Sequence, residues 1–500
     1  MKSVLSRWRN MPVSARSAII FVISSFALKG IAFLTTPIFT RLLSQEQYDV
    51  ITTYGAWTTI LEVFALLGMT SAGVFNVGLN DYKGRRDSYI ASVLLLCNLV
   101  TIVFFVGVFA VKQWVGDTFS VSNNLLFLMF MNMLFHPAHV FWITRQKYEY
   151  KYKLAFVLTV GAAVLSQLFS ILCVTFYDGT NAGEVKLWSM TLVNIAFSLP
   201  LYFYIYGKGL SKKIFSYWKP ILLLALPLLP HYLAQHVMSS ADRIMLESMM
   251  PEGVAAIYAV VANVGMIASL IWTSVNASLV PFTFDKLNVK DHKPINRTVI
   301  LLLAFFAVAC VGVSLIAPEI MKILAPESYY GGVYAVPPVA AVAFLTALYN
   351  VYANVEFYHK KTGFIALSTI VATIINIGLN WWLIPKYSYV GAAYTTLISY
   401  SVLVLMHYLG YKRAAKGKKI YNNALIFLLA LVCVGLCLLS SLLYFSIAIR
   451  YVLVGLVLLV AIWKRKTILN LLKRKKPTAK KSQENIPTAE ALPMGEDKEA

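Results

Sequence analysis

The sequence has few charged residues and few cysteines. Asp, Glu, Lys and Arg make up 13% of the 500 residues, whereas hydrophobic residues make up 59%. Ordinary soluble domains carry about 25% charged residues. The five cysteines all lie in apolar runs, and we interpret them as small hydrophobic side chains. This composition excludes a soluble enzyme, a disordered chain and a disulfide-rich secreted module.

Motifs for nucleotide, metal and hydrolytic chemistry are also missing. The chain has no G-x-x-x-x-G-K-[ST] loop, no H-E-x-x-H and no Cys-His cluster. His136 and His139 flank Pro137, but no carboxylate stands near them in the sequence. The predicted loops are too short to build an external catalytic domain, which argues against a glycan ligase or polymerase. We therefore expect neither an enzyme nor a metal site, and no cofactor.

Long apolar runs dominate the sequence instead. A helix needs about 20 mostly apolar residues to cross a bilayer, and we find fourteen candidate helices. The first, at 18–39, lacks a following cleavage site, so we predict a retained helix rather than a signal peptide. The others lie at 49–77, 88–111, 121–144, 154–177, 185–206, 218–240, 253–281, 298–317, 332–357, 363–384, 389–410, 422–444 and 447–463.

The positive charges alternate between the predicted loops. With both termini cytoplasmic, the cytoplasmic segments hold 36 Lys and Arg residues and the external segments hold 7. This asymmetry follows the positive-inside rule, so the net charge of +22 needs no nucleic acid partner. The sequence therefore predicts a multi-pass protein of the cytoplasmic membrane with both termini cytoplasmic.

An internal repeat divides the chain. Arg41-Leu-Leu matches Arg243-Ile-Met, Arg145-Gln-Lys-Tyr matches His359-Lys-Lys-Thr, and Gly183-Glu-Val matches Gly391-Ala-Ala, at offsets of 202, 214 and 208 residues. We expect an all-α membrane protein with two parallel six-helix lobes around a central cavity. The lobes are 1–210 and 211–415, followed by two additional helices at 416–464. Residues 465–500 are basic and are predicted to form a disordered cytoplasmic tail.

Polar side chains line one face of the first helix. Lys29 lies near its middle, and Arg41 stands at its outer end. Charged groups are costly in a membrane, so each is a candidate functional residue. A cation facing the cavity would suit an anionic substrate such as a phosphate group. The alternative is a lysine that snorkels or pairs with a carboxylate. Glu62 on the next helix could neutralise Lys29 or bind a coupling cation.

The seventh helix combines a bend with a polar stripe. Pro227 and Pro230 remove backbone hydrogen bonds and should bend the helix, which makes it a candidate gating element. Beyond the bend, one face carries His231, Gln235, Ser239 and Asp242. Asp242 and Arg243 are candidates for coupling or gating, with a simple interfacial ion pair as the alternative.

Paired asparagines mark two helices of the second lobe. Asn350 and Asn354 are one turn apart on the tenth helix, and Asn376 and Asn380 are one turn apart on the eleventh. Such amides could bind sugar hydroxyls, as could His231 and Gln235. They could equally hydrogen-bond between helices, and the sequence does not decide between the two.

Four segments of the chain resemble one family. They are Pro37-Ile-Phe-Thr-Arg-Leu-Leu-Ser-Gln-Glu-Gln-Tyr-Asp, Leu226-Pro-Leu-Leu-Pro-His, Ser240-Ala-Asp-Arg-Ile-Met-Leu and Gly391-Ala-Ala-Tyr. Their order and spacing resemble the bacterial polysaccharide-biosynthesis flippases of the multidrug/oligosaccharidyl-lipid/polysaccharide exporter superfamily, over residues 15–410. Asp49 departs from the glycine usual there, and we expect it to alter the turn into the second helix.

The resemblance implies a flippase, not an enzyme. Its substrate would be an undecaprenyl-pyrophosphate-linked oligosaccharide, moved across the cytoplasmic membrane by alternating access for capsule or O-antigen synthesis. Lys29 and Arg41 would contact the pyrophosphate. Implied partners are membrane lipid and the polysaccharide polymerase and chain-length machinery. Two relatives within the superfamily remain as alternatives: a cation-coupled multidrug extruder and a flippase for the peptidoglycan lipid precursor.

Overall fold

The computed structural model describes residues 11–70, 72–115, 121–211 and 213–463. The predicted tail at 465–500 lies outside these residues. The chain divides into two compact units, Met1–Val454 and Gly455–Ala500. The described part of the second unit is the end of one helix. The fold set out below is that of the first unit.

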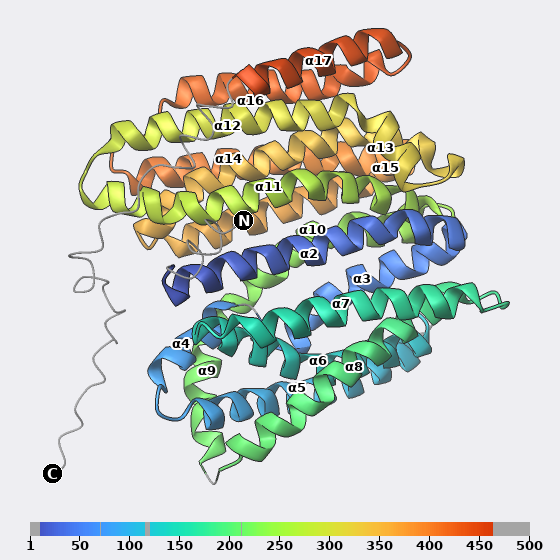
Figure 1. Ribbon diagram of the computed structural model, residues 1–500, viewed down its shortest axis with the longest axis vertical. Coiled ribbons are helices and arrows are strands. Elements are labelled where there is room, and N and C mark those ends of the chain that lie inside the picture. The colour runs from blue at the N-terminus through green and yellow to red at the C-terminus, as the bar shows by residue number, and fades with distance from the viewer. Residues whose placement is uncertain (1–10, 71, 116–120, 212, 464–500) are drawn as a thin grey trace. The chain divides into compact units, whose positions relative to one another are not determined.

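The described residues form helices and connecting turns, with no strand among them (Figure 1). The α-helices are α2 (Val13–Leu42), α3 (Gln45–Ala65), α4 (Ala72–Asp81), α5 (Arg86–Val115), α6 (Asn123–Tyr148), α7 (Tyr152–Thr175), α8 (Ala182–Gly209), α9 (Trp218–Ala225), α10 (Leu229–Met249), α11 (Val254–Asn288), α12 (His292–Leu315), α13 (Ala317–Leu324), α14 (Val336–Tyr358), α15 (Thr362–Ala414), α16 (Asn423–Leu439) and α17 (Ile447–Trp463). Short 3₁₀ helices are η2 (Ile214–Tyr217), η3 (Leu226–Leu228), η4 (Glu327–Ala335) and η5 (Ser440–Leu443).

Eleven stretches of the described chain are long and apolar enough to cross a membrane. The segment Gly363–Ala414 contains two of the predicted runs, because α15 kinks at Ser388, where φ is 54°. The prediction of one helix over 49–77 was wrong. Helix α3 ends at Ala65, and the backbone takes positive φ at Leu67 and Gly68 before α4 begins.

The predicted bend in the seventh helix lies where the prolines are. Helix α9 ends at Ala225, the 3₁₀ turn η3 contains Pro227, and α10 begins with Pro230 near its first position. A proline at the start of a helix loses no intrahelical bond, whereas one in the interior does. The prolines therefore divide the segment into two helices without leaving the turn unsatisfied.

Hydrophobic packing forms three main clusters. One comprises side chains between Tyr54 and Ala225, and a second comprises side chains between Ala268 and Cys437. The third joins early and late segments, and it includes Phe39, Tyr48 and Tyr329. Helix α2 lies between the two groups of helices, where it packs on α7 and contacts α11 and α13 (Figure 1).

A set of hydrogen bonds reinforces the third cluster. We call it the clasp: Thr40, Arg41, Gln45 and Asp49 on one side, with Lys322–Leu324, Ser328 and Gly253 on the other. Thr40 donates to the carbonyl of Leu324 at 2.7 Å, and Arg41 donates to the carbonyls of Lys322 and Ile323 at 3.2 Å. The amide of Gln45 donates to the Ser328 carbonyl at 2.9 Å. The clasp therefore links the end of α2 and the start of α3 to helices more than 200 residues later.

Asp49 does not alter a turn, contrary to the expectation. Helix α3 begins earlier, with a capping box between Ser44 and Gln47, so Asp49 lies inside the helix. Its buried carboxylate accepts the backbone N–H of Gly253, just before α11 begins. A carboxylate is favourable at a helix N-terminus, where N–H groups lack intrahelical partners. The aspartate thus contributes to the clasp, which a glycine could not.

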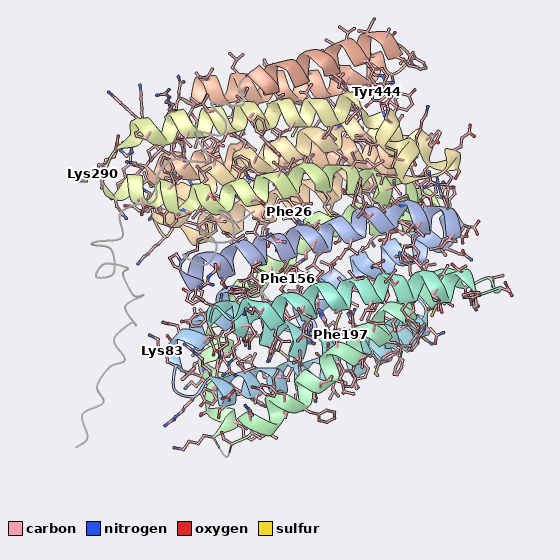
Figure 2. All side chains as sticks on the ribbon, viewed as in Figure 1. Phe26, Lys83, Phe156, Phe197, Lys290 and Tyr444 are labelled. Carbon is pink, nitrogen blue, oxygen red and sulfur yellow. The ribbon has the colours of Figure 1, made fainter. Side chains whose placement is uncertain are left out.

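Basic turns gather at the opposite end from the clasp. Lys83 follows α4 and Lys290 joins α11 to α12, and both lie at the same end of the helices in Figure 2. The charge count places both on one side of the membrane. Which side is cytoplasmic stays a prediction.

Two glycines of the predicted repeat stand where backbones meet. A Cβ on Gly183 would overlap the carbonyl oxygen of Gln47, and one on Gly391 would stand 2.6 Å from the carbonyl oxygen of Leu383. By contrast, a Cβ on Gly207, also in α8, would meet nothing within 4 Å. The paired glycines are thus explained by close packing at the start of each helix.

We expect Gly183→Ala to destabilise the protein by about 1–3 kcal/mol, because the methyl group must displace the backbone of α3. The measurement is thermal unfolding in detergent. The matched control is Gly207→Ala in the same helix, which should be neutral or stabilising by up to about 1 kcal/mol. Equal unfolding temperatures for the two variants would contradict the packing described here.

Candidate functional site

The polar centre of the later helices is the carboxylate of Asp242 on α10. Only 5% of Asp242 is exposed. Tyr258 on α11 donates to Oδ2 at 2.7 Å, and Thr396 on α15 donates to the same oxygen at 2.6 Å. Asn380 on α15 donates to Oδ1 at 2.7 Å. Three helices therefore converge on one negative charge, and each supplies a side chain.

A second layer orients the amide that holds Asp242. Asn380 also donates to Oδ1 of Asn376 at 3.2 Å, and its own oxygen accepts from Thr395. Asn376 in turn lies 3.4 Å from Thr396. Both asparagines are completely buried. We call Asp242, Tyr258, Asn376, Asn380, Thr395 and Thr396 the carboxylate network.

Arg243 makes no direct salt bridge with its neighbour Asp242. Within the described part of the chain, its hydrogen bond goes to the carbonyl of Ser239 at 3.0 Å. The interfacial ion pair considered from the sequence is therefore not formed. Arg243, Ser239, Asp242 and Tyr400 are among the residues that line a cavity of about 300 Å³. A guanidinium has five N–H donors, so most of this group's capacity remains available to a ligand.

The asparagines of α14 make helix contacts. Asn354 donates to Asn276 on α11 at 2.9 Å, and Asn350 donates to the carbonyl of Thr346 in its own helix. Asn354 and Asn380 make the contacts between helices that the sequence left as the alternative to sugar binding, whereas Asn350 and Asn376 bond within their own helices. Their role toward a sugar stays a prediction, and in this structure their amide groups have protein partners.

The cations of α2 differ from each other. Arg41 belongs to the clasp and donates to carbonyls at the end of α13. Lys29 is half-buried and forms no hydrogen bond or ion pair with any described residue. Glu62 does not pair with it, because the Glu62 carboxylate accepts from Thr70 at 3.1 Å. The structure thus leaves Lys29 as an uncompensated charge.

The polar stripe of α10 lies apart from the other predicted residues. His231 is half-buried, and its Nδ1 has no hydrogen-bond partner, whereas Gln235 is exposed. Asp242 lies buried further along the same helix. The structure therefore brings together Asp242, Asn376 and Asn380, with Arg243 beside them, but it does not unite them with Lys29, Arg41, Glu62 or Asn350.

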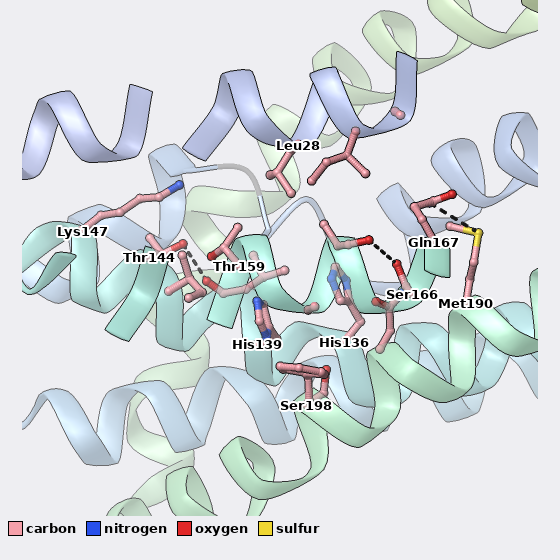
Figure 3. Close-up of a pocket in the computed structure, with 18 residues that line it drawn as sticks. Leu28, His136, His139, Thr144, Lys147, Thr159, Ser166, Gln167, Met190 and Ser198 are labelled. Atoms are coloured by element: carbon pink, nitrogen blue, oxygen red, sulfur yellow. Dashed lines mark hydrogen bonds between the residues drawn. The ribbon is translucent and has the colours of Figure 1, made fainter. Parts of the chain in front are cut away.

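A second polar cavity lies among the early helices (Figure 3). Its volume is about 380 Å³, and α2, α6, α7 and α8 line it. His136 and His139 project into it from α6, and their rings stack at 6.1 Å between centroids. Asn194 and Ser198 face it from α8. We call this the imidazole pocket.

Sequence reasoning missed much of both sites. Tyr258, Thr395 and Thr396 were absent from the predicted set, because single hydroxyls in apolar helices give no signal of convergence. The spacing of His136 and His139 was visible, but it was considered only as a metal site. Their stacking, and the facing polar groups of α8, depend on packing between helices far apart in the chain.

Known proteins resemble the chain in both sequence and fold. Residues 14–286 match the family described as "Polysaccharide biosynthesis protein". The capsular polysaccharide biosynthesis protein CapF of Staphylococcus aureus is 26% identical over 348 residues, which cover 67% of this chain and 84% of that protein. An uncharacterized membrane protein of Haemophilus influenzae is 23% identical over 368 residues, which cover 72% of this chain and 87% of that protein.

Two solved structures share the fold. Lipid II flippase MurJ in an inward closed conformation has a TM-score of 0.64 and 14% identity, covering 90% of this chain and 99% of that one. An outward-facing multidrug resistance MATE family transporter has a TM-score of 0.53 and 16% identity, covering 81% and 96%. Since the family match spans more than half of the sequence, the chain belongs to the polysaccharide biosynthesis protein family.

Proposed function

We propose that the chain is a flippase that moves an undecaprenyl-pyrophosphate-linked oligosaccharide across the bacterial cytoplasmic membrane. The observation that carries the proposal is that Lys29 and Arg243 stand in membrane-length helices without a salt bridge to any described carboxylate. Such charges cost about 2.5–3.5 kcal/mol each on insertion scales. An anionic substrate bound beside these cations would offset that cost. The family match and the fold shared with a lipid II flippase support this choice.

The architecture proposed for this transport function has fourteen membrane helices. Lobes 1–210 and 211–415 would flank a central cavity, followed by the two additional helices at 416–464 and the tail at 465–500. Both termini would be cytoplasmic, as the charge count predicts. Surface polysaccharide synthesis would require polymerase and chain-length machinery as further partners.

The clasp suits one closed state of alternating access. Its hydrogen bonds join the two groups of helices at one end only, and Arg41 is part of it. The broken helix α9–α10 supplies a hinge near Pro227 and Pro230. In this proposal Arg41 releases the α13 carbonyls when the closed end opens, and it then becomes available to the pyrophosphate.

Asp242 is proposed as the coupling group. Its carboxylate is buried, and the side chains that donate to it are neutral, so a proton or a monovalent cation would supply the missing positive charge. Because its donors come from α11 and α15, a change in its charge would alter how three helices pack. Glu62, which accepts a hydrogen bond from Thr70, is the second coupling candidate.

Depletion of the protein in its host tests the function directly. We expect lipid-linked oligosaccharide to accumulate on the cytoplasmic leaflet and surface polymer to disappear. A membrane-impermeant sugar-modifying probe, applied to right-side-out and inverted vesicles, measures the distribution. Normal polymer with altered drug sensitivity would contradict the proposal and favour the multidrug extruder.

Lys29→Ala should abolish flipping while protein levels stay normal, because removing a membrane-embedded charge does not impair insertion. Surface polysaccharide and immunoblots of the membrane fraction measure the two effects. Lys29→Arg should retain activity, and Lys290→Ala, in an exposed turn, serves as the control. Unchanged surface polymer in Lys29→Ala cells would rule out the assigned role.

Asp242→Asn should remove the response of transport to an imposed proton or sodium gradient, because the neutral amide cannot take up a cation. We expect a loss of at least about tenfold in gradient-driven rate in proteoliposomes, equivalent to about 1.4 kcal/mol. Asp291→Asn, a half-exposed position in the turn between α11 and α12, is the matched control. Full gradient dependence in Asp242→Asn would show that coupling lies elsewhere.

A further inference from the structure

The imidazole pocket contains polar groups that the protein itself does not satisfy. Ser198 is completely buried, and its hydroxyl has no hydrogen-bond partner. Asn194, His136 and His139 form no hydrogen bonds with the described residues. Unsatisfied polar groups in an apolar environment cost about 1–3 kcal/mol each in proteins. Their concentration on the walls of one cavity indicates that something else completes their bonding.

The lining selects the chemistry of a ligand. No aspartate or glutamate is among the residues that line the pocket, which disfavours a cationic ligand. A neutral imidazole offers one donor and one acceptor, an amide offers both kinds, and a hydroxyl does the same. A wall of mixed donors and acceptors matches sugar hydroxyls, which also donate and accept.

A metal ion fits the pocket less well. The two histidines supply two nitrogen ligands, and among the described residues no group of three or more His, Cys, Asp or Glu side chains could hold a metal ion. Structural zinc sites have four protein ligands, and catalytic sites have three. The two rings are nearly parallel, at an interplanar angle of 10°.

The lining also includes apolar surface and one cation. Leu28 and Phe197 supply apolar surface for the C–H faces of a ring. Lys147 lies at one end of the pocket, opposite Gln167 and Met190 (Figure 3). The Lys147 ammonium stands 5.5 Å from the ring centroid of Phe21 and has no carboxylate partner among the described residues. The volume of about 380 Å³ falls within the range typical of small-molecule sites, roughly 300–1,000 Å³.

We propose that the imidazole pocket binds a sugar unit of the lipid-linked substrate, with Lys147 beside the phosphate that joins sugar to lipid. This inference rests on the proposed function and adds to it a specific headgroup site. The site lies within the early helices. It is separate from the asparagines of α14 and α15, whose amides already have protein partners.

Binding of two defined lipids tests the site. The protein is placed in nanodiscs, and its affinity is measured for a polyprenyl pyrophosphate without sugar and for the same lipid carrying one N-acetylhexosamine. We expect the wild type to prefer the sugar-bearing lipid by about tenfold. Asn194→Leu combined with Ser198→Ala should remove that preference but retain binding of the sugar-free lipid.

Stability separates a binding role from a structural one. Because Asn194 and Ser198 have no protein partners, apolar replacements should not lower the unfolding temperature. A second variant, Ala163→Leu, fills the pocket without removing a polar group and should also abolish the preference. The control is Ser170→Ala on α7, since Ser170 bonds to Ser166 and Ser189. It should lower the unfolding temperature and keep the preference.

Lys147→Ala provides the third arm. This substitution should lower the affinity for both lipids equally, because both carry the pyrophosphate. If the wild type prefers the sugar-bearing lipid and the Asn194/Ser198 variant keeps that preference in full, the pocket assignment is overturned and the flippase function stands. If the wild type binds neither lipid, and depletion leaves the leaflet distribution normal, the function and the site both fail.

Discussion

The buried carboxylate of Asp242 is the constraint around which the later helices are arranged. Within a bilayer no solvent can compensate a charge or an unpaired polar group, so the protein must supply the partners. Tyr258, Thr396 and Asn380 do so from two other helices, and Asn376 orients the last of them. The register of α10 against α11 and α15 is therefore set by hydrogen-bond geometry as well as by packing. Removing the charge would relax that requirement, which is why this group is suited to coupling.

The early helices contain a polar site of another kind. Lys29 on α2 and Lys147 on α6 have no carboxylate partner among the described residues, and Ser198 faces the imidazole pocket without a hydrogen bond. Full satisfaction rigidifies a polar network, whereas partial satisfaction leaves capacity for a ligand. In this proposal the two roles are divided between the helices: the later helices respond to an ion, and the early helices recognise a headgroup. Helix α2 contacts both groups, so it can transmit a change from one to the other.

Features that depend on neighbouring residues could be predicted from the sequence, whereas contacts between residues far apart in the chain could not. The apolar runs predicted the long helices, and Pro227 and Pro230 predicted the break between α9 and α10, because these are properties of contiguous residues. The prediction of one helix over 49–77 was wrong because the composition stays apolar through the turn at Leu67 and Gly68. The carboxylate network required tertiary information: Asp242 and Asn380 are separated by 138 residues, and nothing in either local sequence indicates the other. Lys29 and Arg41 share one helix, yet their different surroundings depend on α13.

The clasp explains how one closed state can be stable and still reversible. Each of its hydrogen bonds contributes a net of about 0.5–1.5 kcal/mol, more where a charged group takes part. Asp49 adds such a charged bond at the N-terminus of α11. A substrate can overcome the sum of these bonds by binding the other state more tightly. Because Arg41 donates only to backbone carbonyls, opening the clasp leaves no carboxylate behind to recapture it. The guanidinium is then free to bind an anionic headgroup. The same residue can therefore stabilise the closed end and contact the substrate once that end opens.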